Sequence, residues 1–119
     1  YPTVHQMVSG VYGKLKQNIK HVDILKALHP GGSITGAPKE SSMKIIDWLE
    51  DYNRGIYTGT IGFIDSAGNM CFNIAIRTLA INKKIATYGV GGGIVWKSNS
   101  EDERNEAELK SEILKDYIN

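Results

Sequence analysis

The sequence from residue 57 to residue 81 reads YTGTIGFIDSAGNMCFNIAIRTLAI. Residues 58–64 have the composition of a strand, and residues 65–69 (DSAGN) supply the residue types of a tight turn. A second strand is predicted from about residue 70 to residue 81, and a tight connection at Asn82-Lys83 leads to a third strand over 84–90. We therefore expect three antiparallel strands in meander order.

Helical spacing of apolar residues appears on both sides of these strands. It predicts helices over 23–28, over 38–52 and from Ser100 to the end of the chain. Asp23 is the expected N-cap of the first helix, and Ser100 with Glu103 matches a capping box at the start of the last one. The fold class predicted is α+β, an antiparallel sheet with flanking helices.

The beginning of the chain is harder to assign. Residues 4–19 carry an apolar pattern that begins strand-like and becomes helix-like, and residues 31–36 suit a turn. The first residues lack Met and fall directly into the apolar stretch. We expect residues 1–119 to be one segment of a larger domain, with its upstream part outside the chain.

Composition limits the class of protein. Fourteen Lys plus Arg against thirteen Asp plus Glu give a net charge of +1, so nothing favours a nucleic-acid partner. The single Cys71 excludes an intramolecular disulfide and a thiolate metal cluster, which makes the cytoplasm the expected compartment. Because no apolar run approaches the roughly 20 residues that cross a bilayer, no membrane association is expected.

Residues 31–39 (GGSITGAPK) place two hydroxyl groups and a flexible backbone before a predicted helix. Free N–H groups at a helix start favour an anion, so a carboxylate or phosphate site is one interpretation. A glycine-rich turn that only caps the helix is the other. The segment is no phosphate-binding Walker loop, because Ala37 stands where that motif requires Lys.

Arg77 lies in a predicted strand that is apolar on nearly both faces, so we expect a sheet covered on both sides and a buried guanidinium. Arg suits bidentate recognition of a carboxylate, which could belong to a ligand or to a structural ion pair. Residues 89–93 (GVGGG) follow the third strand. They predict either close approach of a ligand to the backbone or a bulge at the sheet edge.

Glu103 and Glu106 are three residues apart on the last predicted helix and share one face with Lys110. Two carboxylates so placed can bind a hard cation such as Mg2+, although an acidic first turn also suits any helix. His5 could donate a proton or a hydrogen bond, but a lone His is also typical of a solvated surface.

Taken in order, these motifs resemble the chorismate-binding enzymes, which include the anthranilate, aminodeoxychorismate, isochorismate and salicylate synthases. The resemblance covers almost the whole chain. It is carried by His5-Gln6-Met7-Val8-Ser9, residues 31–39, Met43, Arg54-Gly55-Ile56-Tyr57, Ile76-Arg77-Thr78, Gly91-Gly92-Gly93-Ile94-Val95, and Glu103 with Glu106 and Lys110. The sequence of residues 31–39 is most similar to that of the branch that aminates chorismate to 4-amino-4-deoxychorismate for folate synthesis.

The resemblance implies that Glu106 ligates Mg2+ with Glu103 beside it, and that Lys110 orients this acidic pair. It also implies a substrate site. Tyr57 and Arg77 would hold the enolpyruvyl carboxylate of chorismate, helped by the backbone amides of Gly91 and Gly93. The ring carboxylate would lie near Ser33, and the departing C4 hydroxyl near His5.

The same resemblance implies an upstream Lys nucleophile, a further Mg2+-binding Glu and a glutamine amidotransferase partner that supplies ammonia. Both upstream residues would precede Tyr1, so the segment alone is expected to be inactive. Lys97 departs from the family, which usually has Asp there. The alternatives are anthranilate, isochorismate or salicylate formation, and a noncatalytic anion-binding fragment.

Overall fold

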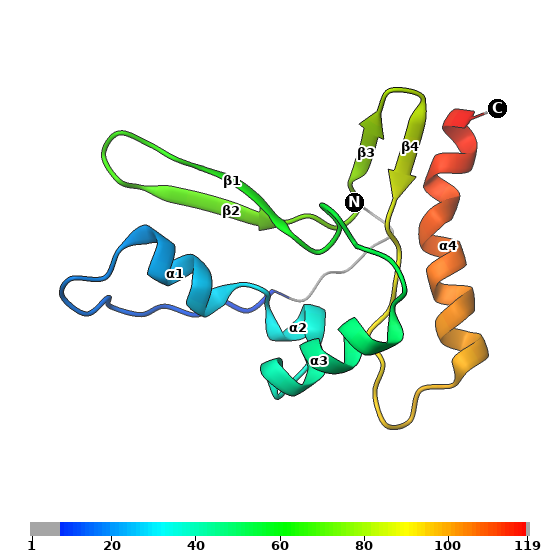
Figure 1. The fold of residues 1–119 in the computed structure, drawn as a ribbon, viewed down its shortest axis with the longest axis horizontal. Helices are drawn as coiled ribbons and strands as arrows, with labels where there is room; N and C mark the ends of the chain where they lie inside the picture. Colours follow the sequence, from blue (N-terminus) through cyan, green and yellow to red (C-terminus); the bar gives the residue numbers. More distant parts are fainter. Residues whose placement is uncertain (1–7, 119) are drawn as a thin grey trace.

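The computed structural model describes residues 8–118, with side chains as far as Leu114, and has the predicted α+β character. Figure 1 shows the elements in chain order. They are α1 (His21–Leu28), α2 (Gly32–Thr35), α3 (Lys39–Leu49), β1 (Thr60–Ile64), β2 (Met70–Ile74), β3 (Leu79–Asn82), β4 (Ile85–Tyr88) and α4 (Ser100–Ile118).

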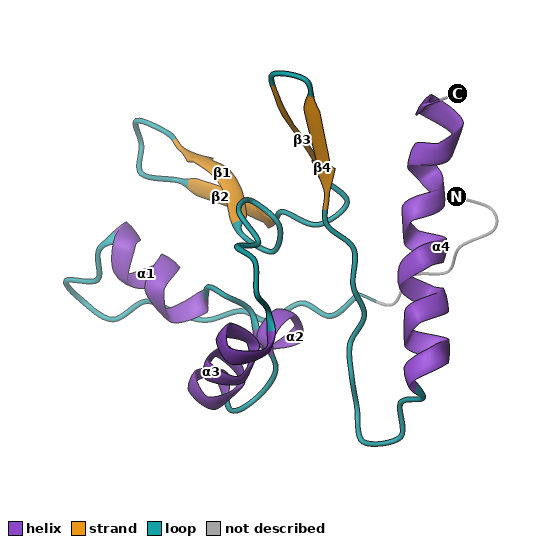
Figure 2. Ribbon diagram, turned by 45° about the vertical axis from the view of Figure 1, so that its right-hand side comes forward, coloured by secondary structure: helices purple, strands orange, loops and turns teal. Residues whose placement is uncertain are grey.

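Strands β1 and β2 form the predicted hairpin, with Thr60 opposite Ile74 and Ile64 opposite Met70. Asp65 organises the turn because its carboxylate accepts hydrogen bonds from the side chain and backbone N–H of Asn69 and from the N–H of Ala67, each at 2.9 Å. These bonds, the one from the Asn69 side chain first, hold the pKa of the Asp65 carboxyl below its ordinary value. Helix α1 lies below this hairpin in Figures 1 and 2, and Nε2 of His21 donates to the Gly68 carbonyl at 2.9 Å.

The predicted second strand over 70–81 does not run through. It breaks at residues 75–78, where the N–H of Ile76 donates to the Ile74 carbonyl at 2.9 Å and Arg77 has a left-handed φ of 53°. β3 then pairs only with β4, so the strands form two separate two-stranded sheets. The expectation of a three-stranded meander was therefore wrong, because the chain turns in a segment whose apolar pattern continues.

The helices follow the prediction with shifted ends. α1 begins at His21, and Asp23 is its third residue, whose carboxylate accepts from the Lys20 N–H at 3.0 Å, so Asp23 is not the N-cap. The predicted helix 38–52 is shorter, over Lys39–Leu49. The predicted turn at 31–36 contains the four-residue helix α2.

Two further expectations are corrected at the ends of the chain. Asn99, not Ser100, caps α4, because its side-chain oxygen accepts from the N–H groups of Glu101 and Asp102 at 2.9 and 3.3 Å. The described part of the strand-to-helix stretch, residues 8–19, forms neither element.

The described residues pack loosely. Ala75 is the only fully buried core residue among them, and most of the side chains of β1 and β2 are exposed or half-buried. The expected sheet covered on both faces is thus not formed within this chain. Figure 2 shows the two hairpins diverging and α4 standing apart from the other helices. Within residues 8–118, no helix combines the length and apolar character that a membrane span requires.

Candidate functional site

The extended segment that leaves β4, residues 89–93, leads toward the loop before α4 (Figures 1 and 2). A Cβ atom on Gly89 would overlap the ring of Tyr57, and one on Gly91 would lie 2.9 Å from its hydroxyl. A Cβ atom on Gly92 would lie 2.6 Å from Oε2 of Glu103. The glycines are therefore required for close approach, and the groups that approach are the protein's own Tyr57 and Glu103. Nothing lies within 4 Å of the corresponding position at Gly93.

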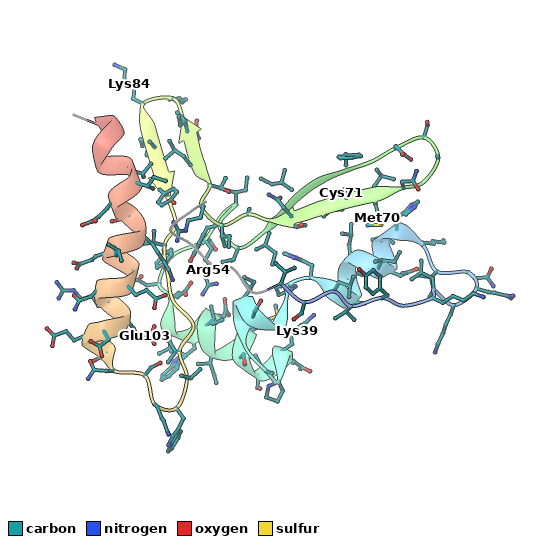
Figure 3. The ribbon with its side chains drawn as sticks, turned by 180° about the vertical axis from the view of Figure 1, so that it is seen from behind. Lys39, Arg54, Met70, Cys71, Lys84 and Glu103 are labelled. Carbon is teal, nitrogen blue, oxygen red and sulfur yellow. The ribbon has the colours of Figure 1, made fainter. Side chains whose placement is uncertain are left out.

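The first turns of α4 present two carboxylates to this segment. Ser98 donates to Oε1 of Glu103 at 2.5 Å, and Oε1 of Glu106 would lie 3.8 Å from a Cβ atom on Gly92. Lys110 bonds both Glu106 and the Gly91 carbonyl, the latter at 2.8 Å. Glu103, Glu106 and Lys110 therefore lie together against residues 91 and 92. Figure 3 labels Glu103 near the base of α4.

The metal prediction can be compared with this donor set. The oxygen atoms of Glu103 and Glu106 converge on the backbone of Gly92, and carboxylate oxygen is the donor that a hard cation prefers. Because Asn99 caps α4, the carboxylate of Glu103 is not engaged in the expected capping box. Among the described side chains of residues 8–114, no group of three or more His, Cys, Asp or Glu could hold a metal ion. The pair fits part of a hard-cation site, and the remaining donors would be other groups or water.

Tyr57 is held by residues that the sequence analysis did not single out for chemistry. Arg54 donates two hydrogen bonds to the carboxylate of Glu50, from Nε at 2.7 Å and from Nη2 at 2.5 Å. Its Nη1 donates to Oγ1 of Thr58 at 3.3 Å, and its Cζ lies 5.9 Å from the centre of the Tyr57 ring. The hydrogen bonds from Arg54 lower the pKa of the Glu50 carboxyl, and the same pair raises the pKa of Arg54. The four-residue spacing of Glu50 and Arg54 gives no signal in the sequence, because that rule applies within a helix and α3 ends at Leu49.

Arg77 differs from its prediction because its side chain is exposed, not buried. The cause is the turn at 75–78, which removes it from the strand. In the described part of the chain it makes no ion pair, so the alternative of a structural salt bridge finds no support. The N–H of Thr58 donates to the Ala75 carbonyl at 2.9 Å, which places Tyr57 and Arg77 beyond the same end of the β1–β2 hairpin.

Two other predicted site residues are not joined to this cluster. Ser33 is exposed on α2, and no hydrogen bond within the described residues connects it to Tyr57 or to α4. The neighbouring Thr35 has a buried hydroxyl group without a partner among the described residues. His5 lies outside the described residues.

A cleft of about 830 Å3 adjoins Tyr57 on the side of α3. Its walls include His29, Thr35, Glu50, Arg54 and Tyr57. Figure 3 labels Arg54 near the centre of the molecule, between the hairpins and the helices. Tyr57 thus lines this cleft and also covers Gly89 of the segment 89–93.

Comparison with known proteins identifies the family. The family described as chorismate binding enzyme matches residues 1–116. Anthranilate synthase component 1 of Saccharolobus solfataricus is 45% identical over 118 residues, which are 99% of this chain and 28% of that protein. The chloroplastic aminodeoxychorismate synthase of Arabidopsis thaliana is 47% identical over 93% of this chain and 12% of its own length.

Aminodeoxychorismate synthase component 1 of Escherichia coli K12 is also 47% identical, over 89% of this chain and 23% of that protein. The chain thus spans less than a third of the length of these relatives. Near-complete coverage by the family and identities above 40% lead to one conclusion: this chain belongs to the chorismate-binding enzymes.

Proposed function

We propose that this chain forms the C-terminal segment of a catalytic domain that aminates chorismate to 4-amino-4-deoxychorismate. The observation that carries the proposal is the convergence of Tyr57, Glu103, Glu106 and Lys110 on the glycine segment 89–93. The names of the relatives at 47% identity and the sequence of residues 31–39 support this branch of the family.

Glu106, with Glu103 beside it, would hold Mg2+, whose chemistry is Lewis-acid stabilisation of negative charge on the ring carboxylate of chorismate. Lys110 bonds Glu106 and the Gly91 carbonyl, so it fixes the direction of that carboxylate relative to the glycine segment. Ser33 would donate a hydrogen bond near the ring carboxylate. These side chains bind and orient the substrate.

The enolpyruvyl carboxylate of chorismate needs a separate set of donors. Arg77 supplies an exposed guanidinium and Tyr57 supplies a hydroxyl group, beyond the same end of the hairpin. The backbone N–H groups of Gly91 and Gly93 would add further hydrogen-bond donors. His5 would hydrogen-bond the C4 hydroxyl and assist its departure by proton donation.

Ammonia would come from a glutamine amidotransferase partner. The name "component 1" of the Escherichia coli relative supports a second subunit. The nucleophilic Lys and the further acidic ligand that the resemblance implies would belong to the upstream part of the same domain.

A second candidate is anthranilate formation. It is favoured by the relative from Saccharolobus solfataricus, which matches 99% of this chain at 45% identity. The two reactions share chorismate and a metal-held ring carboxylate, so residues 1–119 carry features that both would use.

The test uses the full-length protein that contains this chain, incubated with chorismate, ammonium and Mg2+ and analysed by chromatography. We expect 4-amino-4-deoxychorismate, and no product after chelation of the metal. A Glu106→Gln variant should need more Mg2+ for half-maximal rate, whereas Glu108→Gln, which breaks an exposed pair on the same helix, should not. Anthranilate as the product would select the second candidate, and an unchanged chorismate pool would refute both.

A further inference from the structure

We propose that Arg54, which Glu50 holds through two hydrogen bonds, is a positioning residue. It keeps the hydroxyl group of Tyr57 in place for the carboxylate of the substrate. The inference rests on the proposed function, because it concerns how Tyr57 reaches the bound acid. Arg54 is assigned a positioning role because its guanidinium already donates to Glu50 and to Thr58, and both oxygens of Glu50 accept from Arg54.

The pair has the geometry of a rigid support. Both oxygens of Glu50 accept from the guanidinium, at 2.7 and 2.5 Å, and the two side chains are only 24% and 23% exposed. The pair Arg104–Glu108 has the same four-residue spacing, but its side chains are 76% and 60% exposed and share a single contact of 2.9 Å. A two-point, half-buried contact fixes the orientation of a guanidinium, whereas an exposed single contact does not.

Arg54 also constrains the loop that carries Tyr57 and Thr58. Its third donor reaches Oγ1 of Thr58 at 3.3 Å, and that hydroxyl group donates to the carbonyl of Tyr57 at 2.5 Å. Thr58 has a left-handed φ of 64°, an unusual conformation for a β-branched residue that persists only where its surroundings enforce it. Arg54 supplies part of that enforcement, and it also lies over the Tyr57 ring.

The ring of Tyr57 has little tolerance for displacement. It covers Gly89 so closely that a Cβ atom there would overlap it, and its hydroxyl group lies beside Gly91. If Arg54 loses its contact with Glu50, the Tyr57 loop relaxes and the hydroxyl group of Tyr57 moves away from the glycine segment. Substrate binding should then weaken, while the reacting groups stay in place.

One arm of the test observes Tyr57 directly in full-length protein labelled with 3-fluorotyrosine. The fluorine resonance of Tyr57 is identified as the one that disappears in Tyr57→Phe. We expect a single displaced resonance in the wild type, which shifts toward the free amino acid or splits in Glu50→Gln and in Arg54→Lys. Glu108→Gln should leave it unchanged. Because Glu50→Gln is nearly isosteric, it tests the contact between Glu50 and Arg54 even if the Arg54 variant does not fold.

The second arm measures kcat and KM for chorismate. Glu50→Gln should raise KM about tenfold, the scale of one hydrogen bond, with kcat changed less than about twofold. Tyr57→Phe should raise KM similarly, and the double variant should be no worse than Tyr57→Phe, because the hydroxyl group is already absent. A purely structural role would multiply the two effects.

The outcomes test the role of the Glu50–Arg54 contact separately from the proposed function. A wild-type protein that does not turn over chorismate refutes the function, while the fluorine spectra still decide whether Arg54 holds Tyr57. An unmoved Tyr57 resonance in folded Glu50→Gln and Arg54→Lys would overturn the inference. So would KM effects that multiply in the double variant.

Discussion

Arg77 is where backbone geometry and proposed binding can be separated. The residue has a φ of 53° and an exposed side chain, and it has no ion pair within the described residues. A left-handed conformation costs an L-residue roughly 1–2 kcal/mol, and glycine adopts it without this cost. Arg77 is therefore an unfavourable residue for its backbone, which agrees with a role for its guanidinium.

Two substitutions at Arg77 should divide these contributions. Arg77→Ala and Arg77→Gly should both lower kcat/KM at least about tenfold in the full-length enzyme, because both remove a charge-assisted contact to a substrate carboxylate. The unfolding free energy of Arg77→Gly should exceed that of Arg77→Ala by roughly 1 kcal/mol, and its melting temperature should be higher. Steady-state kinetics and thermal melts measure the two effects. Preserved kcat/KM with a steep loss of stability would contradict the substrate role.

Gly89 and Gly93 offer a matched pair within one segment. A side chain at Gly89 meets the Tyr57 ring, whereas at Gly93 it meets open space. We expect Gly89→Ala to destabilise the protein by about 1–3 kcal/mol, as overpacking does, and Gly93→Ala to change stability by less than about 0.5 kcal/mol. Denaturant melts of the two variants provide the comparison. Equal effects at both positions would mean that the Tyr57 ring is not fixed over Gly89.

At the scale of elements, the sequence predicted what is determined locally. The β1–β2 hairpin was predictable because residues 65–69 carry their own turn chemistry, visible in the three hydrogen bonds to Asp65. The break at 75–78 was not, since its residues continue an apolar strand pattern and no Gly, Pro or Asn announces the left-handed Arg77. Alternation of side chains reports burial preference and cannot show where a chain turns without such residues.

The candidate site divides in the same way. The cluster of Glu103, Glu106 and Lys110 was predictable because helical spacing places them on one face. The approach of Tyr57 to Gly89 joins residues far apart in the sequence, and only the fold reveals which group comes close to the glycines. The glycine pattern predicted close approach, but it could not identify the Tyr57 ring.

The Glu50–Arg54 pair connects the end of α3 to the Tyr57 loop, and its strength should depend on pH. Hydrogen bonds from Arg54 hold the pKa of Glu50 below its ordinary 4.5. A carboxyl group with a lowered folded-state pKa stabilises the fold above its unfolded pKa, and this stabilisation is lost as pH falls through the folded value.

We therefore expect Glu50→Gln to lower the unfolding free energy by about 1 kcal/mol near neutral pH. The difference from the wild type should shrink as the solution is acidified through and below pH 4.5. Melting temperatures recorded across this range for both proteins provide the measurement. Glu108→Gln, in an exposed pair, serves as the control with little difference at any pH. A Glu50→Gln deficit that persists unchanged in acid would show that the carboxylate charge is not what stabilises the contact.

The whole molecule is far more open than a compact domain of its size. Its radius of gyration is 17.0 Å, whereas a compact chain of this length has about 13.5 Å. Its accessible surface is 10989 Å2, against roughly 6,400 Å2 for a compact monomer of this mass. Much of the additional surface is apolar, including Trp96 at 100% and Trp48 at 82% exposure. Such a surface needs a covering partner, which in the proposed function is the upstream part of the catalytic domain.

The 119-residue chain alone should therefore self-associate. Burial of apolar surface contributes roughly 25 cal/mol per Å2, so even partial covering of the exposed side chains favours assembly at micromolar concentration. We expect light scattering to give a mass above 13.1 kDa that rises with concentration, together with binding of an apolar dye. Replacing Trp48 and Trp96 by Gln should lower both signals, whereas Lys84→Gln, at the tip of the β3–β4 hairpin (Figure 3), should not. A monodisperse monomer that binds no dye would show that the chain closes over its own apolar residues in solution, and the need for a covering partner would then disappear.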